Sequence, residues 1–198
     1  MNEIRRGQTT ASTGTRIVAV LSLLGGIGFL GAIVVMFSSL ARNTTWAGLW
    51  SDPVLGVVLL VVGVGGVVAL CAALAGLSLI RERTDPGVAS VAALGALGGG
   101  IGALWPVVAV FVLPLASAIV AIYLARVHRL PNSIAVLHAG AGLGCIVVGA
   151  LWAQNASLGL GDLIVPLYPI TWMAIGLALF RGLPSSESPA SSLAFGRR

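Results

Sequence analysis

Apolar residues form long stretches in this chain, and nearly all charged residues lie in the short segments between them. Five intervals hold no Asp, Glu, Lys or Arg: residues 17–41, 53–80, 86–125, 130–161 and 163–180. The hydrocarbon core of a bilayer is about 30 Å thick, and about 20 helical residues cross it. The pattern therefore predicts membrane-spanning helices and an integral membrane protein.

The third interval is too long for one crossing. A single helix over residues 87–125 would be about 60 Å long, twice the thickness of the core. It also begins and ends beside Arg clusters, which requires an even number of crossings. We therefore predict two helices that turn at Trp105 and Pro106, although the glycines at 98–100 and 102 are an alternative place for the break.

The chain is thus predicted to be an all-α, polytopic membrane protein of six helices in three hairpins. The expected spans are residues 17–40, 54–80, 87–104, 107–126, 133–153 and 163–180. Residues 1–16 form a short polar arm, and the polar tail at 182–198 is expected to be disordered. Pro53 stands where a helix tolerates proline, in the first turn.

Composition and charge support this topology. The chain is 58% hydrophobic and 9% charged, whereas soluble domains carry about 25% charged residues. With six spans, one side of the membrane receives ten of the eleven basic residues, all but Arg42. Basic residues mark the cytoplasmic side, so both termini are expected there. The excess positive charge is then a topology signal, and nucleic acid is not an expected partner.

The chain contains no Lys and is rich in Ala, Gly, Val and Arg. This bias is typical of a high-GC bacterial genome and indicates the bacterial cytoplasmic membrane. The first apolar stretch is too long for the hydrophobic region of a signal peptide, so we expect an uncleaved span.

Glycines are expected to hold the helices together, because close backbone approach replaces the hydrophobic drive that lipid does not supply. Three pairs place small residues on one helix face: Gly95 with Gly99, Gly98 with Gly102, and Gly140 with Gly144. Spans 3 and 5 should then be the most enclosed. The alternative is that glycine is merely common in this genome.

Residues 26–31 match the dinucleotide-binding pattern GxGxxG. That site needs a preceding strand and an acidic residue about 20 positions further on. The match lies inside an apolar stretch and position 46 is Trp46, so Gly26, Gly28 and Gly31 are interpreted as a helix-packing face.

Catalytic and metal chemistry have little support. His128 and His138 are the only histidines, and two imidazoles make a poor closed metal or haem site. We expect a loop histidine and an interfacial histidine. Ser117 lacks the flanking glycines of a nucleophile motif, and no span holds a carboxylate. We therefore expect no enzyme activity, no cofactor and no metal.

One region is a candidate ligand site. The sixth span carries Pro166 and Pro169, and Pro169 is expected to kink the helix. If a solute binds, we expect an outward-facing pocket formed by four residues: Trp172 as its floor, Tyr168, Gln154 and Asp162. The alternative is that Trp172 packs against span 3 or span 5 and the prolines only shape the bundle.

The second half of the chain resembles a group of known sequences. Residues 125–131 (ARVHRLP), the segment 149–152 (GALW) and residues 166–172 (PLYPITW) with 176–181 (GLALFR) are similar to uncharacterised six-span proteins of high-GC bacteria. The resemblance covers residues 107–182. Residues 102–106 (GALWP) give a weaker likeness to the HdeD-like acid-resistance membrane proteins. Both resemblances imply a six-helix bundle and no catalytic residue.

The leading expectation for function is a non-enzymatic membrane protein, accessory or stress-related. It would act in the lipid bilayer through helix contacts with a second copy or another membrane protein. The alternative is a small-solute transport component, such as the substrate-binding subunit of a vitamin importer. An intramembrane enzyme is a third possibility.

Overall fold

The computed structural model describes residues 13–40, 52–79, 86–104, 106–127, 130–153 and 164–181. Within these ranges the chain is helical apart from short turns and contains no strand. The all-α prediction is therefore confirmed for this part of the chain. The arm at 1–12, the tail at 182–198 and the turn at Trp105 lie outside the described residues.

The helices follow the apolar stretches closely. Their bounds are α1 (Thr13–Leu40), α3 (Pro53–Val58), the π-helical segment η1 (Leu59–Val64), α4 (Gly65–Leu79), α5 (Pro86–Leu104), α6 (Pro106–Arg126), α7 (Asn132–Ala153) and α8 (Leu167–Arg181). The segments α3, η1 and α4 join end to end into one rod. The described residues therefore form six rods.

Local sequence explains where several helices begin. The Asp52 carboxylate accepts hydrogen bonds from the backbone N–H groups of Val54, at 2.9 Å, and Leu55, at 3.1 Å. This carboxylate caps α3. Pro53 follows in the first helical position, where a backbone N–H would have no acceptor within the helix, so proline loses no hydrogen bond there. Helices α5 and α6 also start with a proline.

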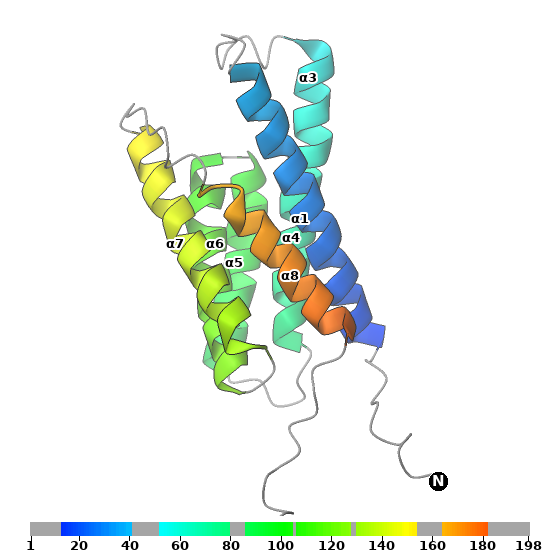
Figure 1. Ribbon diagram of the computed structural model, residues 1–198, viewed down its shortest axis with the longest axis vertical. Helices are drawn as coiled ribbons and strands as arrows, with labels where there is room; N and C mark the ends of the chain where they lie inside the picture. The colour runs from blue at the N-terminus through cyan, green and yellow to red at the C-terminus, as the bar shows by residue number, and fades with distance from the viewer. Residues whose placement is uncertain are drawn as a thin grey trace, which may run out of the picture.

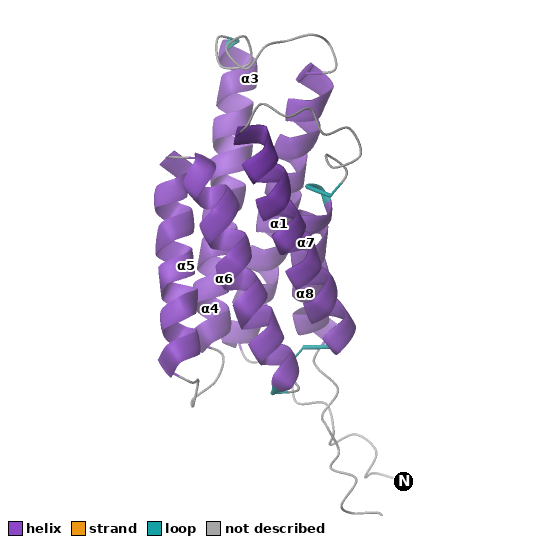
Figure 2. Cartoon of the chain, turned by 90° about the vertical axis from the view of Figure 1, so that its left-hand side faces the viewer, coloured by secondary structure: helices purple, strands orange, loops and turns teal. Residues whose placement is uncertain are grey.

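The six rods stand side by side and alternate in direction (Figure 1). Each packs against its neighbours in the chain, and α8 returns to pack against α1 as well as α7. The order around the bundle is thus α1, α4, α5, α6, α7, α8, and the ring closes. The first residues of α1 and the last of α8 lie at the same end, while α1 and α3 extend beyond the other helices at the opposite end (Figures 1 and 2).

Apolar helices make this a membrane-associated bundle. Three stretches are long and apolar enough to cross a bilayer: Thr13–Ser38, Pro53–Leu77 and Asn132–Leu151. The remaining rods contain shorter apolar stretches, Pro86–Gly100, Phe111–Arg126 and Leu167–Arg181. Large apolar side chains also face outward, among them Val54 at 70% exposure and Val136 at 69%. An outer surface of this kind fits lipid better than water.

The closest approaches between helix backbones lie around α1. A Cβ atom on Gly66 of α4 would stand 2.7 Å from the backbone nitrogen of Phe29. On the other side, a Cβ on Gly26 would stand 2.8 Å from the carbonyl oxygen of Pro169 in α8. Gly28 likewise faces the backbone of Gly66. The interpretation of the GxGxxG match as a helix-packing face is thus confirmed at Gly26 and Gly28.

Glycines of α5 also lie against neighbouring helices. A Cβ on Gly99 would stand 2.6 Å from the sulfur of Cys71 in α4, and a Cβ on Gly98 would stand 2.6 Å from Val112 in α6. Gly95 meets Ala116 of α6 in the same way. The surroundings of Gly102 lie outside the part of the chain that is described.

The pair on α7 behaves differently from the prediction. A Cβ on Gly144 would meet Ile164, but Gly140 is exposed and nothing lies within 4 Å of a Cβ placed there. Gly140 therefore packs against none of the described helices of its own chain. Gly142 of α7 does meet another helix, because a Cβ there would stand 3.1 Å from the carbonyl oxygen of Pro114.

Helix α8 begins later than expected, which changes the effect of its prolines. The expected span began at residue 163, whereas the helix begins at Leu167. The N–H of Leu167 donates to the carbonyl of Ile164 at 3.0 Å, so a turn leads into the helix. Pro169 then lies in the first turn, where an N–H has no intrahelical acceptor. Pro169 is therefore not an interior proline of α8, in contrast to Pro114 of α6, and the break or kink expected at Pro169 stays a prediction.

Candidate functional site: a buried hydrogen-bonded cluster

Four polar side chains from three helices meet inside the bundle: Ser117 of α6, His138 of α7, and Tyr168 and Thr171 of α8. Ser117 is 2% exposed, His138 0% and Tyr168 1%. Tyr168 and Thr171 are three residues apart, which places both on one face of α8. We call this group the polar cluster.

His138 of α7 links α6 and α8, the helices on either side of α7. Its Nε2 atom lies 3.0 Å from Ser117 Oγ on α6. Its Nδ1 atom lies 2.8 Å from Thr171 Oγ1 on α8. Both ring nitrogens therefore face a hydroxyl group, and a hydroxyl can donate to or accept from an imidazole.

The hydroxyl groups have further partners. Ser117 Oγ lies 2.8 Å from the Tyr168 hydroxyl and 3.0 Å from the carbonyl oxygen of Pro114, one turn earlier in α6. Thr171 Oγ1 lies 2.7 Å from the carbonyl oxygen of Tyr168. The cluster thus contains five short contacts that link α6, α7 and α8.

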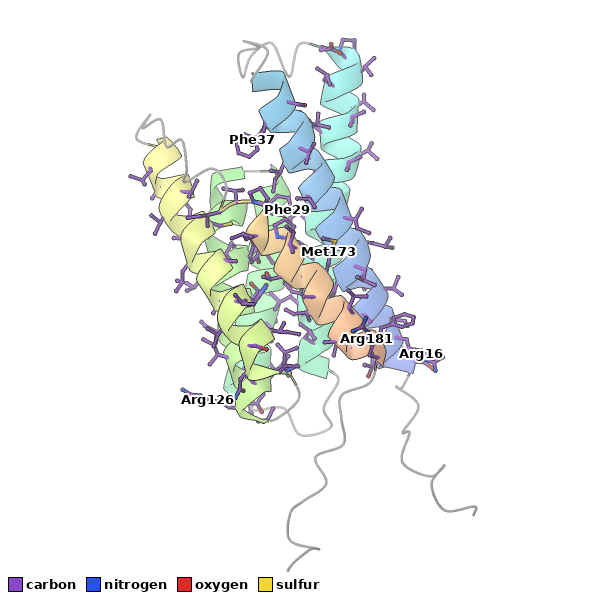
Figure 3. The ribbon with its side chains drawn as sticks, in the orientation of Figure 1. Arg16, Phe29, Phe37, Arg126, Met173 and Arg181 are labelled. Carbon is purple, nitrogen blue, oxygen red and sulfur yellow. The ribbon has the colours of Figure 1, made fainter. Side chains whose placement is uncertain are left out.

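Aromatic rings enclose the imidazole. The Tyr168 ring stacks on His138 with centroids 5.3 Å apart and planes inclined by 28°. The Trp172 ring meets His138 edge-on at 5.1 Å and 82°. Phe29 of α1 covers Tyr168 at 6.4 Å, also edge-on. Phe29 lies between α1 and the upper part of α8 in Figure 3.

The indole nitrogen of Trp172 differs from the other polar atoms of this region. Trp172 is 0% exposed, and its Nε1 has no hydrogen-bond partner among the described residues. A buried donor without an acceptor costs free energy. The Tyr168 hydroxyl is close enough to interact with this N–H, but the geometry is not that of a hydrogen bond, so an acceptor that reaches the interior of the bundle would bind it better.

The polar cluster lies well inside the helices. His138 is about 9 Å along α7 from its first residue, at 1.5 Å per residue. Ser117 is about 13 Å along α6 from its last residue. Arg16, Arg126 and Arg181 all lie at that end of the bundle, with Arg126 on the opposite side from Arg16 and Arg181 (Figure 3). The cluster is thus separated from the charged end by about 1.7 helical turns along α7 and about 2.5 turns along α6.

The contacts of these residues were not anticipated from the sequence. His138 is buried and has a partner at both ring nitrogens, while its expected place at the membrane interface stays a prediction. Ser117 was set aside because it lacks flanking glycines, yet its hydroxyl faces that imidazole. One signal pointed to His138: an ionisable residue within a membrane segment usually has a polar partner and a function.

The predicted ligand pocket is only partly described. Tyr168 and Trp172 lie side by side, with ring centroids 6.5 Å apart, and both are buried. Trp172 also packs against His138 of α7, as the alternative expected. Gln154 and Asp162 lie outside the described residues. The pocket therefore stays a prediction.

Two other chemistries were considered for the cluster. The Ser117–His138 distance is that of a nucleophile and its general base, but Ser117 is 2% exposed and His138 is 0% exposed, so neither side chain lies at the surface. For metals, the described residues contain no group of three or more His, Cys, Asp or Glu side chains that could hold an ion. Cys71 and Cys145 are free thiols.

Comparisons with protein-family models, with curated protein sequences and with solved structures find no match to this chain.

Proposed function

We propose that this chain is a multi-pass protein of the bacterial cytoplasmic membrane that acts without catalysis, through helix contacts with a second copy or another membrane protein. All six rods would cross the bilayer, and both termini would be cytoplasmic.

The distribution of charge along the bundle supports this topology most directly. The three arginines of the described helices, Arg16, Arg126 and Arg181, lie at one end of the bundle (Figure 3). The carboxylate of Asp52 caps α3 at the other end. Basic residues collect on the cytoplasmic side, so the end with the arginines would face the cytoplasm.

The outward face of α7 supports association with another helix. Gly140 is exposed there, with nothing within 4 Å of a Cβ. Leu137 at 65% exposure and Leu143 at 53% flank it. In membranes, helices approach one another closely where a small residue lies between larger apolar ones. A second helix would pack at this position.

Association is tested by purification in a mild detergent, with oligomeric state and co-purifying proteins measured. Gly140→Leu should abolish the complex, because a large side chain would keep the second helix away. Gly65→Leu is the matched control, since Gly65 is also exposed with nothing within 4 Å. A monomer without partners in the unsubstituted protein would contradict the proposal.

A second candidate function, a small-solute transport component, is favoured by one observation. The buried N–H of Trp172 has no acceptor among the described residues, and a bound solute with a carbonyl or hydroxyl group would supply one. Trp172→Phe should then reduce the retention of a co-purifying solute while the melting temperature changes little. Loss of stability with no change in bound solute would leave Trp172 as a packing residue.

A further inference from the structure

The number of protons that the polar cluster can place in hydrogen bonds can be compared with the number of its short contacts. Five contacts between 2.7 and 3.0 Å connect Ser117, His138, Tyr168, Thr171 and the carbonyl of Pro114. A neutral imidazole and three hydroxyl groups provide four protons. Five contacts therefore share four protons, and one contact is left without a hydrogen bond whichever tautomer is present.

One tautomer of His138 carries its proton on Nδ1. The ring then donates to Thr171 Oγ1, and Thr171 donates to the carbonyl oxygen of Tyr168. On the other side, Ser117 donates to Nε2, and the Tyr168 hydroxyl donates to Ser117. Every proton is used, and only the contact between Ser117 and Pro114 is empty.

The other tautomer carries the proton on Nε2. The ring now donates to Ser117, and Ser117 donates to the carbonyl oxygen of Pro114. Thr171 donates to Nδ1, and Tyr168 again donates to Ser117. Every proton is again used, and the empty contact is the one between Thr171 and Tyr168. The two tautomers thus make equal numbers of hydrogen bonds, and no heavy atom moves between them.

A fifth proton fits the same arrangement. In the imidazolium both ring nitrogens donate, to Thr171 and to Ser117. Thr171 donates to the carbonyl of Tyr168, and Ser117 to that of Pro114. With the Tyr168 hydroxyl donating to Ser117, all five contacts hold a proton. The protonated ring is therefore the only state in which the cluster is complete.

Among the described residues, no charged side chain contacts the ring. The described groups that contact the ring are the Ser117 hydroxyl from α6, with Tyr168, Thr171 and Trp172 from α8. The charged side chains of the described helices, Asp52, Arg16, Arg126 and Arg181, lie at helix ends. Cys145, the thiol of α7, contacts the carbonyl of Val165 at 3.8 Å. Burial opposes a lasting charge, so the neutral tautomers are the resting states.

We propose that His138 is a proton-binding site inside the bundle, at which the imidazole takes up a proton at one ring nitrogen and releases one from the other. The proton comes from water and returns to it. Uptake gives the imidazolium, and loss of either ring proton gives one of the two tautomers. The site goes beyond the proposed association of helices, and it supplies the ionisable group that carboxylates provide in other membrane proteins.

The tautomers can be read directly from ¹⁵N chemical shifts of the ring. The full-length His128→Gln protein, labelled with ¹⁵N-histidine and placed in lipid vesicles, contains His138 as its single imidazole. At neutral pH we expect both ring nitrogens to show shifts between the protonated and unprotonated limits, because both tautomers are populated and exchange. A single fixed tautomer in this protein would overturn the proposal.

Two further variants in the same background should move the equilibrium in opposite directions. Thr171→Val removes the partner of Nδ1, so the proton should reside on Nε2 and be donated to Ser117. Ser117→Ala removes the partner of Nε2, so the proton should reside on Nδ1 and be donated to Thr171. Tyr168→Phe leaves both ring contacts in place and should keep the averaged shifts. Averaging that persisted in both of the first two variants would show that the cluster does not control the ring.

Discussion

Buried serines of this bundle differ in whether their partners belong to their own helix or to another. Ser22 is 0% exposed and donates to the carbonyl of Val18 in the same helix, at 2.9 Å. Ser117 also has such a partner in Pro114, but it contacts His138 and Tyr168 on two other helices as well. Removing Ser22 leaves no side chain without a partner, whereas removing Ser117 leaves two polar groups incomplete.

This difference predicts unequal costs for the same substitution. Ser117→Ala should lower the free energy of unfolding by roughly 1–2 kcal/mol, because the Tyr168 hydroxyl loses its acceptor and the imidazole loses one partner. Ser22→Ala should change it by less than about 0.5 kcal/mol. Thermal unfolding in detergent measures both. Equal losses for the two variants would mean that the contacts between helices add nothing to stability.

At the scale of helices, the sequence identifies where most elements begin and end. Charges and prolines such as Pro53, Pro86 and Pro106 bound the apolar stretches, so helix bounds follow from hydropathy and capping. Hydropathy does not separate a helix from an apolar turn. For this reason the predicted sixth span begins at residue 163, whereas α8 begins at Leu167. The side of α7 that faces inward is also not visible in its sequence, because α7 is apolar on most sides.

The polar cluster could not be derived from the sequence for a related reason. Ser117 and Tyr168 are separated by 51 positions and belong to different helices. Their contact depends on how α6, α7 and α8 are each rotated about the helix axis, and close packing between the helices sets that rotation. The close approach of Gly142 in α7 to Pro114 in α6 is one of the packing contacts that set this rotation. Neither Ser117 nor Tyr168 forms part of a recognisable motif.

Two adjacent glycines test the role of backbone approach between helices. A Cβ on Gly66 would stand 2.7 Å from the nitrogen of Phe29, a backbone atom that cannot move aside, whereas Gly65 has nothing within 4 Å. Gly66→Ala should therefore destabilise the protein by roughly 1–3 kcal/mol. Gly65→Ala should stabilise it by about 0.5–1 kcal/mol, because alanine favours the helix. Melting temperatures that shift in the same direction would contradict this packing.

At the scale of the whole molecule, three features fit one arrangement in a membrane. They are the ring of six rods, the apolar outer surface and the charged end. The helices alternate in direction. The start of α1 and the ends of α6 and α8 therefore lie at the same end of the bundle, and these helix ends carry Arg16, Arg126 and Arg181 (Figures 1 and 3). Lipid would surround the apolar sides, while the cluster around His138 stays enclosed by protein. We propose on these grounds that the rods are six membrane spans.

Topology mapping tests this central claim most directly. Reporters fused after residues 48, 84, 106, 129 and 158 should report outside, inside, outside, inside and outside, because the rods alternate and both termini would be cytoplasmic. The fusion after residue 106 decides most, since it lies between α5 and α6, the two helices placed within one uncharged interval. An outside signal there is the result that six spans predict, and a cytoplasmic signal there would contradict them.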